Sequence, residues 1–199
     1  MIERREFAEL HCLSNYSFLR GASHPEELVY KASDLGYSAI AITDECSYSG
    51  LAKAHVAAKQ CGIKLIVGAE FFVDMTHGEE KNSVENIIML APTRQAYGQL
   101  SAFISKIRRK NQKGNSYLHY EDCQIGLSDC LILWSPELQD IDIQVSVGQK
   151  LKTIFQNFWI TLELFQDGFD IDKTAQALTL SSRLNLRLVA SNNVHTHVP

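Results

Sequence analysis

The sequence has no long apolar run. Nowhere in its 199 residues does a stretch approach the roughly 18–20 apolar residues of a membrane-spanning helix. The opening residues, MIERREFAEL, carry charge with no apolar stretch behind them, so they do not resemble a secretory signal. No charge of one sign dominates, with 19 Lys and Arg against 23 Asp and Glu. This mild acidity argues against a protein that coats DNA, and we expect no membrane partner.

Several short motifs are also missing. The sequence contains no dinucleotide-binding or P-loop glycine pattern, no HExxH, and no readable Ser-His-Asp or Cys-His arrangement. It has no CxxC, and its five cysteines are unevenly spaced, which indicates reduced thiols and a cytoplasmic location. Those cysteines are Cys12, Cys46, Cys61, Cys123 and Cys130.

The overall composition is that of a globular protein, with 45% apolar and 21% charged residues. These values exclude a disordered tail, a collagen-like repeat and a low-complexity linker. No shift in composition marks a boundary along the chain, so residues 1–199 are expected to form a single domain.

Short apolar runs alternate with helical patterns along the chain. Ser23 and Glu26 are spaced as a capping box, with Pro25 in the first turn and Gly36 as a stop. Helices are predicted at 23–36, 51–61, 147–155 and 171–184, with the longest starting at Thr93. Strands are predicted at 9–13, 39–43, 64–73, 87–91, 130–135, 158–164 and 187–191. The stretch 112–129 lacks periodicity and is expected to be a surface excursion.

This βα order predicts an α/β fold in which parallel strands are joined by right-handed crossovers. Either an open sheet or a closed barrel satisfies that order, and about seven units favour a barrel. In both arrangements, side chains at the carboxyl ends of the strands gather at one edge or mouth. Polar residues occur at or near those positions: His11, Asp44, Glu45, Glu70, Ser135, Glu137, Glu163, Asn192, Asn193, His195 and His197.

Converging groups of this kind could form a pocket for a divalent metal or a phosphate. Asp44 and Glu45 could equally cap the turn that follows them, and His195 and His197 could be surface residues. Glu70 is harder to explain as structural, because a carboxylate inside the apolar strand GAEFFV needs a partner or a metal.

A basic cluster closes the longest predicted helix and contains Arg108, Arg109 and Lys110, with Lys106 and Lys113 beside them. Cations suit the carboxyl end of a helix dipole, so a solvated helix end is the simpler interpretation. Contact with a nucleic-acid backbone is the sharper alternative. The cluster has no interleaved aromatic residues, which would limit such contact to non-specific binding.

Three stretches together resemble a known family. The segments AELHCLSNYSFLRGASHPEEL, ITDECS and ASNNVHTHVP resemble the PHP (polymerase and histidinol phosphatase) domain of bacterial C-family DNA polymerases, the alpha-subunit group. These segments are most similar in sequence to the error-prone, damage-inducible branch. The resemblance implies a distorted seven-stranded (βα)7 barrel. The chain stops at HVP without a helix stop, as expected of a piece of a longer polymerase.

PHP domains that are active hold up to three divalent ions with His, Asp and Glu ligands, and some act as 3'–5' exonucleases. The resemblance places nine pocket positions on this chain, of which His11, Glu70 and His195 are unaltered. Glu45 keeps an oxygen ligand in place of an imidazole. The remaining positions fall on Leu13, Arg20, Asn86, Glu137 and Asn193. Arg20 is a permanent cation and cannot coordinate a metal ion.

The substitutions predict that Arg20 pairs with Glu70 or Glu45 and supplies the charge once given by metal ions. The domain would then be a catalytically silent module that supports the polymerase and binds its partners. Expected partners are the rest of the polymerase chain, DNA through that chain, and replication or translesion accessory subunits. No cofactor is expected here beyond partial Zn or Mn, with Mg for the parent polymerase.

A residual phosphoesterase or 3'–5' exonuclease using His11, Glu45, Glu70 and His195 is the competing hypothesis. A binding module unrelated to polymerases is a third possibility. It would require the opening and closing motifs to be coincidence.

Overall fold

A computed structural model describes residues 7–76, 84–124 and 126–198 of the chain, and the start of MIERREFAEL lies outside these ranges. Within them, seven strands lie side by side in the order β1-β2-β3-β4-β6-β7-β8, and β5 (Leu118–His119) pairs separately with β3. The seven are β1 (Ala8–Glu9), β2 (Ala39–Ile42), β3 (Lys64–Asp74), β4 (Val84–Ala91), β6 (Leu131–Ser135), β7 (Phe158–Glu163) and β8 (Leu188–Ser191).

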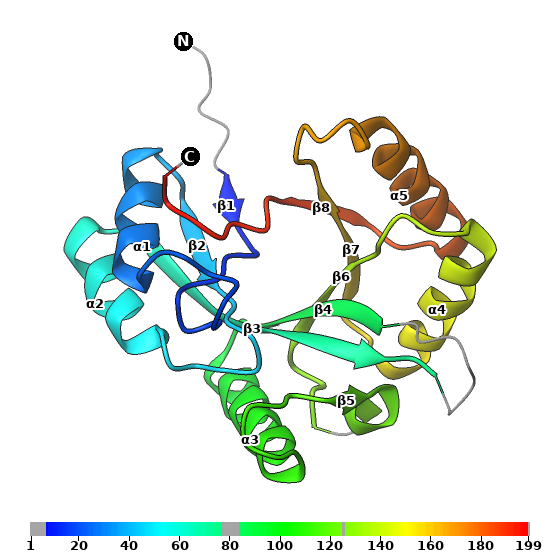
Figure 1. Cartoon of the computed structure of the whole chain (residues 1–199), viewed down its shortest axis with the longest axis horizontal. Helices are drawn as coiled ribbons and strands as arrows, with labels where there is room; N and C mark the ends of the chain where they lie inside the picture. The colour runs from blue at the N-terminus through cyan, green and yellow to red at the C-terminus, as the bar shows by residue number, and fades with distance from the viewer. Residues whose placement is uncertain (1–6, 77–83, 125, 199) are drawn as a thin grey trace.

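The two ends of this sheet meet just beyond β1 and β8. Cys12 and Val194 form a parallel bridge, in which the Leu13 amide donates to the Val194 carbonyl at 2.8 Å. The Val194 amide donates in turn to the His11 carbonyl at 2.9 Å. The sheet is therefore a nearly closed barrel, and the α/β fold with seven barrel strands is confirmed (Figure 1).

The expectation that all strands are parallel is wrong for β4, which runs antiparallel to both β3 and β6. Only residues 75–83 separate β3 from β4, and a parallel crossover needs a dozen or more. The sequence therefore reverses direction here instead of crossing back. The other neighbouring pairs along the barrel, from β1 to β3 and from β6 to β8, are parallel.

Five helices surround the barrel within the described ranges, with α1 and α2 on one side, α3 below, and α4 and α5 on the other (Figure 1). The predicted helices are present, although α4 begins six residues earlier than expected because Asp140 caps it. Part of the expected excursion forms a short 3₁₀ helix, η1 (Tyr120–Gln124). The bounds are α1 (Pro25–Asp34), α2 (Leu51–Cys61), α3 (Arg94–Lys110), α4 (Ile141–Ile154) and α5 (Asp170–Leu184).

The capping box at the start of α1 lies one residue later than the sequence predicts. His24 is the N-cap, and its backbone amide donates to the Glu27 carboxylate at 2.8 Å. Ser23, which the sequence favours as a cap, bonds instead to the His197 ring at 2.7 Å. Tertiary contact with the end of the chain overrides the local preference for serine at this position.

Strand alternation divides the apolar side chains between two sides of the barrel wall. On β4, Ile87 and Met89 join the large cluster that packs under the helices. Ile88 and Leu90 point the other way, with Leu133 of β6, and fill the barrel interior. The interior is thus an apolar plug, and polar side chains can gather only above it, at the mouth. Among the described residues, no helix is long and apolar enough to cross a membrane.

Candidate functional site

A buried histidine lies at the mouth of the barrel between two carboxylates. His11, which follows β1, places its Nε2 2.7 Å from Glu70 of β3 and its Nδ1 2.7 Å from Glu163 of β7. The His11 and Glu70 side chains are fully buried. Because carboxylates only accept hydrogen bonds, both ring nitrogens must carry protons. His11 is therefore an imidazolium in this arrangement.

The electrostatics agree with that assignment. Burial alone would disfavour the charged ring, but the hydrogen bonds to Glu163 and Glu70 outweigh it and raise the pKa of His11 to about 9. Burial would likewise raise the pKa of Glu70, but hydrogen bonds from His11 and Arg20 lower it to about 2. His11 and Glu70 are thus held in their charged forms at neutral pH.

Arg20 completes the network from the loop between β1 and α1. Its guanidinium donates through Nη1 and Nη2 to the two oxygens of Glu70 and reaches Glu45 Oε2 at 3.3 Å. The guanidinium also lies 4.8 Å from the centre of the Phe72 ring. Asn86 of β4 donates to Glu70 at 3.1 Å. The sequence predicts that Arg20 pairs with Glu70 or Glu45, and in the structure it contacts both.

The remaining predicted positions lie around this network without joining it fully. His195 bonds to Asn193 at 2.8 Å, and burial together with nearby Arg20 lowers its pKa. Leu13 is fully buried. Glu137 is exposed at the rim, where its backbone carbonyl accepts from Gln176.

Asp44 has a structural role, but its carboxylate holds the loop before α1, whereas the capping interpretation expected it to hold the turn that follows Asp44. Its carboxylate accepts from the Ser14 amide at 2.8 Å and from the Ser14 and Ser17 hydroxyls at 2.7 Å. Two buried acids outside the predicted ligand set also matter. Glu9 accepts hydrogen bonds from the backbone amides of Leu10 and His11. Glu163 bonds to the His11 ring on the side opposite Glu70. The only sequence signal for Glu163 was its place at a strand end.

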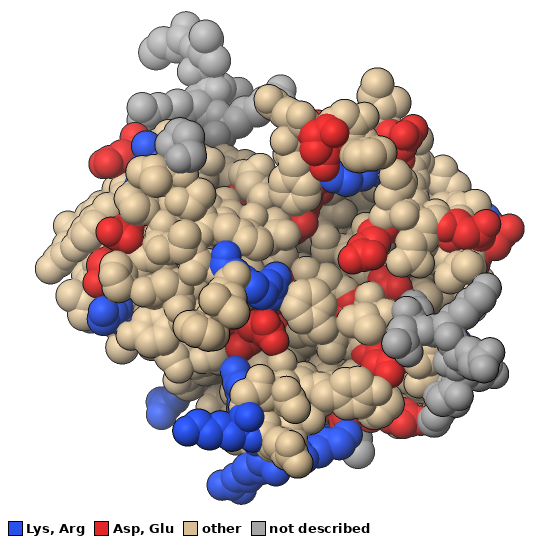
Figure 2. Space-filling view, in the orientation of Figure 1, with Lys and Arg blue, Asp and Glu red and all other residues tan. Residues whose placement is uncertain are grey.

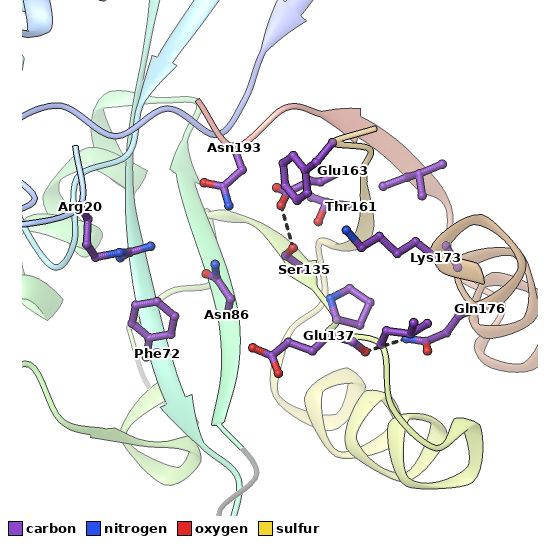
Figure 3. Close-up of a pocket in the computed structure, with 15 residues that line it drawn as sticks. Arg20, Phe72, Asn86, Ser135, Glu137, Thr161, Glu163, Lys173, Gln176 and Asn193 are labelled. Carbon is purple, nitrogen blue, oxygen red and sulfur yellow. Dashed lines mark hydrogen bonds between the residues drawn. The ribbon is translucent and has the colours of Figure 1, made fainter. Parts of the chain in front are cut away.

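A cavity of about 440 Å³ opens above the network. Figure 3 shows Arg20, Phe72 and Asn86 on one side of it and Lys173 and Gln176 of α5 on the other. Ser135, at the end of β6, donates to Glu163 at 3.1 Å across the floor. The labelled lining residues are Arg20, Phe72, Asn86, Ser135, Glu137, Thr161, Glu163, Lys173, Gln176 and Asn193.

The residues present do not fit a three-metal centre. An imidazolium has no free lone pair, so His11 as held here cannot coordinate an ion. Arg20 places a positive charge against Glu70, where the metal would need the carboxylate. Leu13 has no donor atom. In the described part of the chain, no group of three or more His, Cys, Asp or Glu side chains is arranged to hold a metal ion.

Figure 2 shows Lys and Arg side chains gathered at the lower edge of the molecule, over α3. Arg108 does not extend freely from this patch, because it donates to the backbone carbonyls of Cys46 at 3.0 Å and Glu45 at 3.1 Å. Lys110 pairs with Asp122 at 2.5 Å. The Arg109 side chain makes no hydrogen bond or ion pair to the residues that the structure describes, and it is the better placed of the two arginines for a phosphate.

Arg108 and Arg109 should therefore differ in their effects on stability. Replacing Arg108 with alanine removes two hydrogen bonds to the backbone after β2 and should lower the free energy of unfolding by about 1–2 kcal/mol. The matched Arg109→Ala change should stay within about 0.5 kcal/mol. Urea denaturation compares the two. Equal effects would show that the Arg108 contacts contribute nothing to stability.

Neutralising Arg108, Arg109 and Lys110 together should weaken any DNA binding. It should also reduce the slope of the logarithm of DNA affinity against the logarithm of salt concentration.

The fold and the position of the site at the barrel mouth define a class of protein. The model of the PHP domain family matches residues 9–160, and the chain belongs to that family. The chain is also similar to the error-prone DNA polymerases of Methylococcus capsulatus, at 44% identity over 193 residues, and Dechloromonas aromatica, at 43% over 199. These matches cover 96% and 97% of this chain but only 17% and 18% of the relatives, in their N-terminal part.

Two solved structures share the fold. An amidohydrolase from Chromobacterium violaceum, solved with bound sulfate and no metal, has a TM-score of 0.72 and 15% identity, and covers 94% of this chain and 87% of its own. A chain from Bifidobacterium adolescentis, assigned as a metal-dependent phosphoesterase, has a TM-score of 0.66 and 12% identity, with 97% and 89% covered. At these identities the likeness concerns the fold alone.

Proposed function

We propose that this chain serves as the PHP domain of an error-prone DNA polymerase and is itself catalytically silent. The observation that carries the proposal is the Arg20–Glu70–His11 network. In it, two cations, Arg20 and His11, pair with the buried Glu70 carboxylate that a metal ion would need as a ligand. A buried carboxylate is stabilised by such partners only when its geometry and hydrogen bonds are satisfied. Glu70 meets that condition with three partners, Arg20, His11 and Asn86.

The activity of the whole polymerase would be DNA-directed nucleotidyl transfer, used in synthesis past DNA damage and dependent on Mg. Its support is the identity of about 40–44% to error-prone DNA polymerases. In that setting the domain's partners are the rest of the polymerase chain, DNA through that chain, and replication or translesion accessory subunits. A cytoplasmic location fits the five cysteines, all of which are free thiols.

A residual phosphoesterase or 3'–5' exonuclease is the second candidate. The observation in its favour is the polar cavity at the barrel mouth, in a fold shared with a chain assigned as a metal-dependent phosphoesterase. Such an activity would use Zn or Mn at partial occupancy, held by His11, Glu45, Glu70 and His195. It requires Arg20 to release Glu70, which separates the two proposals experimentally.

Elemental analysis tests the silent role. After exposure to Zn or Mn and removal of loose ions, the purified chain should retain far less than stoichiometric metal. It should also leave 3'-terminated single-stranded DNA intact. As a positive control, Leu13→His with Arg20→Asp supplies an imidazole and a carboxylate in place of an alkyl chain and a cation, and should gain metal. Stoichiometric metal in the natural chain, with chelator-sensitive hydrolysis, would establish the phosphoesterase instead.

A further inference from the structure

Helix α5 carries apolar side chains that face solvent. Ile171, in its first turn, is 83% exposed, and Leu178, two turns later, is 57% exposed. These positions are seven residues apart, so they lie on one face of the helix. Leu180 and Leu184, on the opposite face, pack in the large core cluster. Helix α5 therefore has a second apolar face, which no described residue covers.

The loop before α5 extends this face to the rim of the cavity at the barrel mouth. Phe165 and Phe169 are both exposed, and Phe165 lines the cavity together with the exposed Leu138. Neighbouring apolar side chains at such exposure are a feature of interaction surfaces, unlike single scattered ones. This surface is called the α5 face here, and it comprises Leu138, Phe165, Phe169, Ile171 and Leu178.

The loop is braced, so the α5 face is already formed in the free chain. The Asp170 carboxylate accepts the backbone amides of Phe165 at 3.1 Å and Gln166 at 3.0 Å. Asp167 accepts the Phe169 amide at 3.0 Å. Bracing of this kind reduces the entropy lost when a surface binds a partner.

Acidic side chains surround the α5 face. They are Glu137, Asp140, Asp142, Asp167, Asp170 and Asp172. Lys173 pairs with Asp167 at 2.8 Å, and Arg183 pairs with Asp142 at 2.7 Å. The other four carboxylates make no ion pair within the described ranges. Figure 2 shows Asp and Glu side chains spread over the side of the molecule that carries α4 and α5. Such a rim attracts a cationic partner and repels nucleic acid and anionic lipid.

We propose that the α5 face binds a basic amphipathic helix of a separate protein. The apolar side chains of that helix pack along Ile171 and Leu178 and at the cavity rim beside Phe165. Its Lys and Arg side chains pair with the surrounding carboxylates. A helical partner fits because the apolar residues of α5 form a stripe along the helix, which packs against the matching stripe of another helix. The inference does not depend on the polymerase proposal, since it concerns a surface of this chain alone.

Binding of a synthetic peptide tests this inference. The probe is a fluorescein-labelled amphipathic peptide of Leu and Lys, about 14 residues or four helical turns long. Its control is the analogue with Glu in place of Lys. In anisotropy titrations the Lys peptide should bind the 199-residue chain, and the Glu peptide should not. Hydroxyl-radical labelling of Ile171 and Leu178 should fall in the bound state, while Val56, exposed on α2, should keep its labelling.

A double variant supplies the energetic readout. Ile171→Gln with Leu178→Gln should weaken binding of the Lys peptide about tenfold or more, because it removes two apolar anchors. It should leave the melting temperature unchanged, since both side chains are exposed and glutamine suits a helix. The matched Val56→Gln change should alter neither quantity.

Three results would overturn the proposal. One is a Lys peptide that fails to bind, or that binds the natural chain and the double variant equally well. Self-association of the natural chain that the double variant abolishes would assign the α5 face to a second copy. Binding of a single-stranded DNA oligonucleotide that the double variant abolishes would assign it to nucleic acid.

Discussion

Replacing Arg20 with alanine is expected to lower the free energy of unfolding by about 3–5 kcal/mol, because it leaves a buried carboxylate without its bidentate partner. Glu70 is fully buried, and Arg20 donates to both of its oxygens. The charge of His11 remains, but His11 is also shared with Glu163. Losing one member of a buried network costs more than its net contribution to stability, since the others cannot return to water.

Urea denaturation of Arg20→Ala against Arg109→Ala provides the measurement. Arg109 is the matched control, since its exposed side chain makes no hydrogen bond or ion pair to the residues that the structure describes. Adding Glu70→Gln to Arg20→Ala should restore part of the loss, since a neutral amide needs less compensation. An unchanged unfolding free energy for Arg20→Ala would show that Arg20 lies in solvent and does not fill the pocket.

Stability is also expected to fall as the pH rises from about 6.5 to 9. The pKa of His11 is raised from 6.5 to about 9, so its contribution is fully present below 6.5 and is lost as the pH passes through about 9. The difference between these two pKa values of His11 corresponds to roughly 3 kcal/mol of unfolding free energy. Glu70 behaves in the opposite sense. Its pKa is lowered from 4.5 to about 2, so its contribution is present above 4.5 and is lost as the pH falls towards 2.

The combined contribution of the two groups should therefore be greatest between about pH 4.5 and 6.5. Unfolding free energies from urea titrations at pH 5 to 9 would show the alkaline loss. In His11→Gln that loss should disappear, whereas His55→Gln, a change on the exposed face of α2, should keep it. A natural chain whose stability is level from pH 6 to 9 would mean that His11 is neutral and donates to only one carboxylate.

The sequence by itself accounted for much of the fold. Apolar spacing located the helices, and the buried run at Ala39–Ile42 identified β2. These features are local, because the side chains that decide them lie within one or two turns of each other. The prediction of parallel order was wrong for β4, because the link after β3 is too short for a parallel crossover and the chain reverses there. The N-cap of α1 is His24 and not Ser23, because the Ser23 hydroxyl bonds to His197, 174 residues away.

The site divides in the same way. The resemblance to PHP domains placed Leu13 and Arg20 at positions that hold metal ligands in active members. The chemistry of a guanidinium then predicted that Arg20 pairs with Glu70 or Glu45. Only the tertiary structure decided the state of His11. It depends on Glu163, which is 152 residues away in the sequence and reaches the ring from β7. A second carboxylate on the far side of a ring converts it from a metal ligand into a cation, and no local pattern encodes that contact.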